Sequence, residues 1–96
     1  MKKGYWIVHV DILNAESFKA YVNANEKAFN LYGARFLARA GLSTVVEGIS
    51  RGRNTVIEFP SYDLALHCWK SPEYQEARSL RKDAAEIDIV IVEGVE

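Results

Sequence analysis

The stretch Val56-Ile57-Glu58-Phe59-Pro60-Ser61 ends one element of the fold and begins the next. Its alternating apolar residues predict a strand, which Pro60 stops, and Ser61 is a favourable N-cap for a helix. Ten residues on, Ser71-Pro72-Glu73-Tyr74-Gln75 repeats the signal. Pro72 would occupy the first helical position, where its missing N–H breaks no hydrogen bond. The C-terminal half therefore runs from a strand into two successive helices.

Working outward from this stretch, the remaining elements follow from hydrophobic spacing. Asn14 caps a helix whose apolar residues recur every three or four positions as far as Gly33, a residue suited to a helix end. The other expected elements are strands at 5–12, 35–39, 54–59 and 87–93, an extended continuation at 44–48 after a bulge or break at Gly41, a turn at 50–53, and helices from Ser61 to about Lys70 and from Ser71 to about Ala85.

This order of elements, β-α-β-β-α-β, predicts an α+β fold of the ferredoxin-like type with a four-stranded antiparallel sheet. Both crossovers in such a unit are right-handed, so the helices should cover the same face of the sheet. The 96 residues are expected to form one domain spanning 1–96.

The face of the sheet without helices is predicted to be partly apolar. Strand residues alternate between the two faces, which assigns Arg35, Leu37 and Arg39 to the open face and Phe36 and Ala38 to the other. Further members of the open face are Tyr5, Ile7, His9, Asp11, Val56, Glu58, Asp88, Val90 and Val92. Monomers rarely expose an apolar patch larger than a few hundred Å². We therefore expect a homodimer through this face, with a monomer that has a ligand groove there as the alternative.

Composition excludes several classes of protein. The net charge is −1 with acids and bases interspersed, unlike the clustered cations of a nucleic-acid-binding surface. The single cysteine, Cys68, permits no internal disulfide and is expected to be a small core residue. No apolar run reaches the roughly 18 residues of a membrane span. Neither a metal-ligand cluster nor a glycine-rich phosphate loop is present, so we predict no metal and no cofactor. With neither a membrane span nor a signal peptide in the sequence, we expect a cytoplasmic protein without a nucleic-acid or membrane partner.

The chain resembles the family called domain of unknown function 1330 over nearly its whole length. The matching pieces are Gly4-Tyr5-Trp6-Ile7, Tyr32 to Arg39, Glu47-Gly48, Val56 to Ser61, Ser71 to Gln75, Arg81 and Ile91 to Gly94. The resemblance implies a ferredoxin-like fold in the dimeric α/β-barrel superfamily. That superfamily also contains small monooxygenases, muconolactone isomerase-like enzymes and stress-responsive barrel proteins. The family has no settled activity, so the resemblance assigns no residue a role.

Three polar residues assigned to the open face form one candidate site. His9 and Glu58 could approach each other on neighbouring strands, and a histidine beside a carboxylate can act as a general base. Arg39 could hold an anionic oxygen of a substrate through its paired N–H donors. The alternative is a hydrogen-bonded network at the dimer interface, because buried charges must be paired whatever the function.

A second set of candidates could line a pocket between helices and sheet. Its aromatic members are Tyr21, Tyr32, Trp69 and Tyr74, whose helical spacing is more often that of a packed core. Arg81 could join them in substrate binding or form a structural salt bridge with Glu58 or Glu93.

Three functions from different classes are consistent with these residues. The first is a homodimer that binds a small organic molecule and acts as a cofactor-independent monooxygenase- or isomerase-like enzyme, with His9 and Glu58 as catalytic residues and Arg39, Tyr21, Trp69, Tyr74 and Arg81 as substrate-binding residues. This activity is implied by the superfamily alone. The second is a non-catalytic ligand-binding or stress-associated module, and a purely structural dimer is a third possibility.

Overall fold

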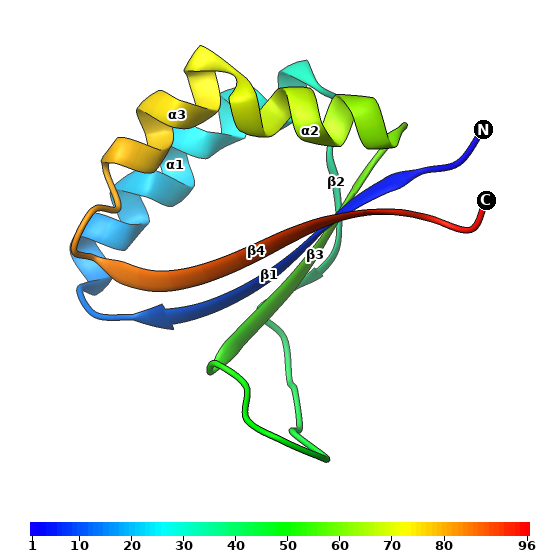
Figure 1. The fold of residues 1–96 in the computed structure, drawn as a ribbon. Helices are drawn as coiled ribbons and strands as arrows, with labels where there is room; N and C mark the ends of the chain where they lie inside the picture. The colour runs from blue at the N-terminus through cyan, green and yellow to red at the C-terminus, as the bar shows by residue number, and fades with distance from the viewer.

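Four strands form a single antiparallel sheet in the order β2-β3-β1-β4, and three helices lie over one face of it (Figure 1). The computed structural model describes all 96 residues. The elements are β1 (Gly4–Ile12), α1 (Ala15–Leu31), β2 (Arg35–Arg39), β3 (Arg53–Phe59), α2 (Tyr62–Lys70), α3 (Pro72–Ser79) and β4 (Ala85–Glu93). The predicted α+β, ferredoxin-like fold with helices on one side of the sheet is confirmed.

The helix ends lie where the capping residues predict them. Asn14, Ser61 and Ser71 each accept a hydrogen bond of 3.1 Å from the backbone N–H three residues on. Gly33 follows α1 with a φ of 73°, the left-handed conformation that glycine adopts without strain. One end differs, because α3 stops at Ser79 rather than near Ala85 and the chain turns there into β4.

The core is built around Trp6, the third residue of β1. Its ring is fully buried, and its Nε1–H donates a hydrogen bond of 2.9 Å to the carbonyl of Ala65 in α2. The rings of Tyr74, Phe29 and Phe59 lie 4.9, 5.3 and 5.4 Å from it, centroid to centroid. Trp6 thus contacts all three helices as well as the sheet. Its one polar atom, Nε1, has a hydrogen-bond partner.

The alternation of side chains along β2 is interrupted at Leu37. Phe36 pairs with Ile57 but Ala38 pairs with Val56, so β2 has one more residue than its partner strand in this interval. Beyond the bulge the faces are exchanged, and Arg39 lies opposite Thr55 on the face that the helices cover. The assignment of Arg39 to the open face is therefore wrong, and the bulge expected at Gly41 lies earlier.

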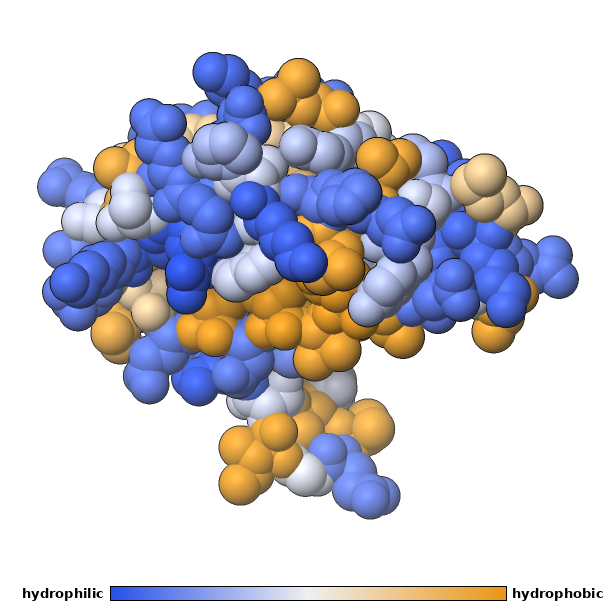
Figure 2. Space-filling view, turned by 45° about the horizontal axis from the view of Figure 1, so that its top comes forward, coloured by the Kyte–Doolittle hydropathy of each residue, from blue (hydrophilic) through white to orange (hydrophobic).

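Residues 40–52, here called the arm, connect β2 to β3 and belong to no strand. The extended continuation expected at 44–48 is therefore a loop. Figure 1 shows the arm projecting from the side of the sheet opposite the helices, and Figure 2 shows apolar side chains gathered on it. The apolar side chains of Leu42, Val46 and Ile49 are almost completely exposed. No other part of the chain covers these large apolar side chains.

Candidate functional site

A cavity of about 130 Å³ lies between α1 and the covered face of the sheet. Helix α1 supplies one wall, and β1, β2, β3 and β4 supply the other. The lining residues are Trp6, Val8, Val10, Phe18, Tyr21, Val22, Asn25, Phe29, Phe36, Arg39, Ala40, Arg53, Thr55, Ile57, Ile87 and Ile89. Twelve of these sixteen residues are hydrophobic. The cavity is therefore an apolar chamber with a few polar groups, the usual composition of a small-molecule site.

Asn25 is the polar residue in the interior of this chamber. It lies on α1 four residues after Tyr21 and four before Phe29, so it shares their inward-facing stripe. Only 5% of its surface is exposed, and its side-chain amide forms no hydrogen bond with another residue. Its amide is not a fully enclosed group without a partner, since only Arg81 Nε is one, so the amide reaches the accessible space of the cavity. The amide of Asn25 thus offers a donor and an acceptor to whatever enters the cavity.

Two arginines stand where the cavity meets solvent, at the end of the sheet from which the arm leaves. Arg39 reaches this face through the bulge in β2, and its guanidinium carbon lies 4.1 Å from the centroid of the Phe36 ring. Arg53 begins β3 on the same face, two residues before Thr55. Both side chains are exposed, and neither forms an ion pair within the chain. The mouth of an apolar cavity therefore carries two unneutralised positive charges.

Tyr21 connects the cavity to the helical layer behind it. Its hydroxyl shares a hydrogen bond of 2.7 Å with the hydroxyl of Tyr74 on α3. Arg81 donates a longer one, 3.4 Å, from Nη2 to the Tyr74 hydroxyl, and its guanidinium carbon lies 5.1 Å from the centroid of the Tyr21 ring. Burial raises the pKa of Tyr74 well above its usual value, so this hydroxyl stays protonated. The chain Arg81–Tyr74–Tyr21 fixes the position of the ring that lines the cavity.

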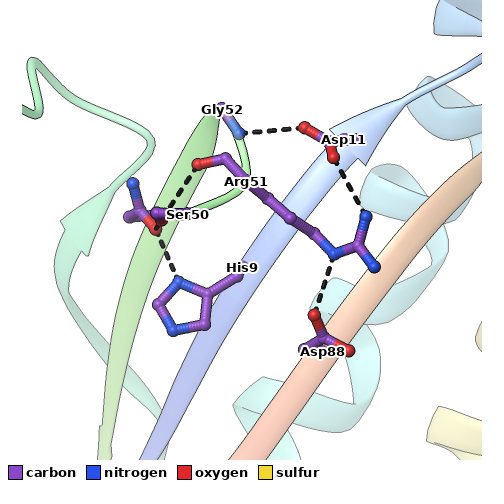
Figure 3. A network of polar contacts seen from close by, with 7 residues as sticks. His9, Asp11, Ser50, Arg51, Gly52 and Asp88 are labelled. Atoms are coloured by element: carbon purple, nitrogen blue, oxygen red, sulfur yellow. Dashed lines mark hydrogen bonds and ion pairs between the residues drawn. The ribbon is translucent and has the colours of Figure 1, made fainter. Parts of the chain in front are cut away.

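The open face of the sheet carries a different polar cluster, drawn in Figure 3. Arg51, at the base of the arm, contacts Asp11 at 2.9 Å and Asp88 at 2.8 Å. The backbone N–H of Gly52 donates to the other oxygen of Asp11 at 2.9 Å. Both hydrogen bonds lower the pKa of Asp11, and the one from Gly52 has the larger effect. The cluster ties the arm to β1 and β4.

His9 lies beside this cluster and not near Glu58. The imidazole Nδ1 is hydrogen-bonded to the Asn54 side chain, directly across from it on β3. Glu58 pairs instead with Tyr5, four residues from His9 along β1, which is about 13 Å at 3.3 Å per residue. The predicted His9–Glu58 pair is therefore wrong. Arg39 belongs to the covered face by its register, although both it and His9 border a shallow hollow beside the arm.

The remaining predicted site residues divide into those that line the cavity and those that support it. Tyr21 lines it. Tyr74 is fully buried behind it, and Trp69 packs against Tyr74 with their centroids 5.3 Å apart. Arg81 reaches no carboxylate, since both ion pairs of the chain belong to Arg51, so the salt bridge expected with Glu58 or Glu93 is absent.

Sequence reasoning missed Asn25 and Arg53. A signal for Asn25 was present, because a polar residue at a core position of an amphipathic helix must find a partner or face a cavity. Arg53 lies two residues before Thr55 and four before Ile57, so in a strand it would face the same side as they do. Its position next to Gly52 instead favoured a turn, which hid this relationship.

Two absences complete the description. No three His, Cys, Asp or Glu side chains gather closely enough to hold a metal ion. None of the helices has both the length and the apolar composition needed to cross a bilayer.

The fold and the cavity define a ferredoxin-like α+β domain with a chamber between its first helix and its sheet. The sequence profile of the family described as "Domain of unknown function (DUF1330)" matches residues 3–95, so the chain belongs to this family. No curated protein shows significant sequence similarity to the chain.

Solved structures support the same fold. A protein of unknown function from Rhodopseudomonas palustris has a TM-score of 0.77 at 16% identity, covering 99% of this chain and 84% of that one. SnoaB, a cofactor-independent oxygenase from Streptomyces nogalater, has a TM-score of 0.64 at 7% identity, covering 96% and 92%. A dimeric ferredoxin-like protein of unknown function from Thermobifida fusca has a TM-score of 0.59 at 13% identity, covering 96% and 89%. At these identities the likeness is one of fold.

Proposed function

We propose that this protein binds a small organic molecule in the cavity under α1, and that the Asn25 amide holds it. The amide of Asn25, which lines the cavity and bonds to no other residue of the chain, is the observation that carries the proposal. A ligand carbonyl or hydroxyl would pair with this amide, and the surrounding apolar side chains would bury the ligand's hydrocarbon part. The volume of about 130 Å³ sets the size, since an engineered apolar cavity of about 150 Å³ accepts benzene.

The lining favours binding over base-catalysed chemistry. It contains no His, Asp, Glu, Lys or Cys, the side chains that most often act as general bases or nucleophiles. His9, the residue proposed as a base from the sequence, lies on the other face of the sheet. A proton-abstracting enzyme needs a base within hydrogen-bond reach of its substrate. We therefore favour the non-catalytic, ligand-binding alternative.

A cofactor-independent oxygenase is the second candidate. The specific observation in its favour is that Arg39 and Arg53 could stabilise a substrate that ionises by itself, such as an acidic phenol or a benzylic carbon acid. The net reaction would convert a CH₂ group and dioxygen into a carbonyl group and water. Oxygen uptake with 2-indanone, a benzylic carbon acid small enough for a cavity of this size, separates the candidates. Catalysed uptake that Asn25→Leu abolishes would favour an enzyme, and uptake no faster than in buffer would favour a binding protein.

Benzamide tests the binding proposal, because it combines one ring with an amide that can pair with Asn25. We expect it to shift the resonances of cavity residues such as Trp6 in ¹⁵N–¹H spectra. Asn25→Leu keeps the side-chain size and removes both polar atoms, so benzamide binding should weaken by about tenfold while toluene binding is retained.

Asn23→Leu is the matched control, since Asn23 is exposed on the same helix. It should leave both affinities unchanged. If benzamide at millimolar concentration shifts no cavity resonance, or binds Asn25→Leu as well as the wild type, the proposal fails.

We further infer that a second copy of the chain covers the open face of the sheet. This face leaves Leu37, Val90 and Val92 about half exposed, and the apolar arm projects from the same side. The Thermobifida fusca protein, which shares the fold, is described as dimeric. Sedimentation should show a dimer, and Val90→Glu should dissociate it, because the charge would have to be buried.

Leu31→Glu provides the control for the dimer. Leu31 is exposed to a similar extent at the end of α1, on the helical side of the molecule. It should leave the dimer intact. A wild-type chain that sediments as a monomer at high concentration would contradict the inference.

A further inference from the structure

We propose that the natural ligand of the cavity is a small apolar carboxylic acid, bound with its carboxylate between Arg39 and Arg53. This inference rests on the proposed function and adds the class of ligand. The apolar body of such an acid would lie under α1, beside Asn25, and its charged end would face the two guanidinium groups at the mouth.

The two arginines are close neighbours on one face of the sheet. Arg39 lies directly across from Thr55, and Arg53 is two residues from Thr55 along β3. Diagonal neighbours of this kind have Cα atoms about 7–8 Å apart, a distance that two long side chains can span to a shared anion. Guanidinium groups present parallel N–H donors that match a carboxylate.

Neither charge is neutralised by the protein. The ion pairs of the chain are both formed by Arg51, with Asp11 and Asp88 on the open face. No Asp or Glu lines the cavity. Arg51 shows how this protein arranges a structural arginine, with carboxylates on two sides. Arg39 and Arg53 carry the same charged group, but they border an apolar cavity and have no carboxylate partner. This arrangement is expected where a ligand supplies the anion.

The position of Arg39 depends on the bulge in β2. With regular alternation, this side chain would point to the open face. The bulge turns it to the cavity, where its guanidinium lies against the Phe36 ring. Stacking on an aromatic ring restricts the side chain while leaving its outer N–H groups available. An arginine so held loses less freedom when an anion binds.

Benzoate and benzamide test this inference, because they share a shape and differ in charge. Affinities would be measured by ¹⁵N–¹H titration at neutral pH and low salt. The wild type should bind benzoate about tenfold more tightly than benzamide, and Arg39→Gln/Arg53→Gln should remove this preference without weakening benzamide. Added salt should weaken benzoate binding only.

Arg78→Gln is the matched control, because Arg78 lies on α3 and does not line the cavity. It should retain the preference. Equal affinities in the wild type, or a preference for benzoate that survives in the double variant, would overturn the inference while benzamide binding still supports the cavity as a site. If neither probe binds, both this inference and the proposed function are overturned.

Discussion

Tyr21 and Tyr74 share a hydrogen bond between their hydroxyl oxygens, 2.7 Å apart, in the interior of the helical layer. It connects α1 to α3, which are distant in sequence. Because Tyr21 lines the cavity, Tyr74 determines where one wall of the cavity lies. The bond also satisfies both hydroxyls, which would otherwise be buried without a partner.

Tyr74→Phe removes this hydrogen bond and changes no apolar contact. Tyr74 is fully buried, so the variant leaves the Tyr21 hydroxyl without its partner and Arg81 without its acceptor. We expect the free energy of unfolding to fall by about 1–2 kcal/mol in urea denaturation. Tyr62→Phe is the control, since the Tyr62 hydroxyl bonds to no other residue, and it should be neutral. Equal stability of the two variants would contradict the assigned role.

Gly4, the first residue of β1, lies against the backbone of Ser61 and Tyr62, where β3 is connected to α2. A Cβ atom at this position would lie 2.5 Å from the Ser61 carbonyl oxygen and 2.7 Å from the Tyr62 Cα. Both are backbone atoms, so they cannot rotate away as a side chain could. Gly4→Ala should therefore lower the free energy of unfolding by about 1–3 kcal/mol.

Gly41→Ala is the matched control for Gly4→Ala. A Cβ atom at Gly41 would have no other atom within 4 Å. This variant should be as stable as the wild type in the same denaturation experiment. A neutral Gly4→Ala would show that the turn between β3 and α2 can move, contrary to the close packing described here.

Local signals in the sequence were sufficient for the fold. Asn14, Ser61 and Ser71 each carry a side-chain oxygen that can cap a helix, and each does so. Alternation along β1, β3 and β4 correctly assigned their two faces. These features depend on residues next to one another in the chain, so no knowledge of the tertiary structure was needed.

The candidate site was harder to predict from the sequence, because the position of Arg39 depends on one irregularity in β2. A bulge at Leu37 reverses the direction of Arg39, and nothing in the residues of β2 specifies a bulge there. The expected pair of His9 and Glu58 failed for a related reason, since strand assignment alone does not determine register. Asn25 differs, because its place on an apolar helical stripe was visible in the sequence.

The base of the arm should respond to acid through Asp11. Hydrogen bonds from Gly52 and Arg51 lower the pKa of this carboxyl in the folded chain, so its contribution is present above the ordinary value of 3.8. It is lost as the pH falls below that value and through the folded pKa. The Gly52 amide resonance should therefore shift over this acidic range.

Two variants separate this effect from general acid unfolding. Asp11→Asn keeps an acceptor oxygen for Gly52 but cannot titrate, so the acid shift of the Gly52 amide should disappear. Asp88→Asn leaves the Gly52–Asp11 hydrogen bond in place, and the shift should remain. A Gly52 amide that is equally insensitive to acid in all three proteins would disprove the anchoring role of Asp11.

Cys68 should be chemically inert in the folded protein. Its side chain is fully buried on α2, and burial raises the pKa of its thiol from 9.0 to about 12. The reactive thiolate is therefore disfavoured, and Ellman's reagent at mildly alkaline pH should react only after denaturant is added. Because the thiol ionises more readily in the unfolded chain, the free energy of unfolding should decrease as the pH rises from 9.0 toward about 12. In Cys68→Ala, the free energy of unfolding should decrease less over this alkaline range. Rapid labelling of the native wild type would contradict the prediction, because it would show that the helical layer opens more readily than its packing indicates.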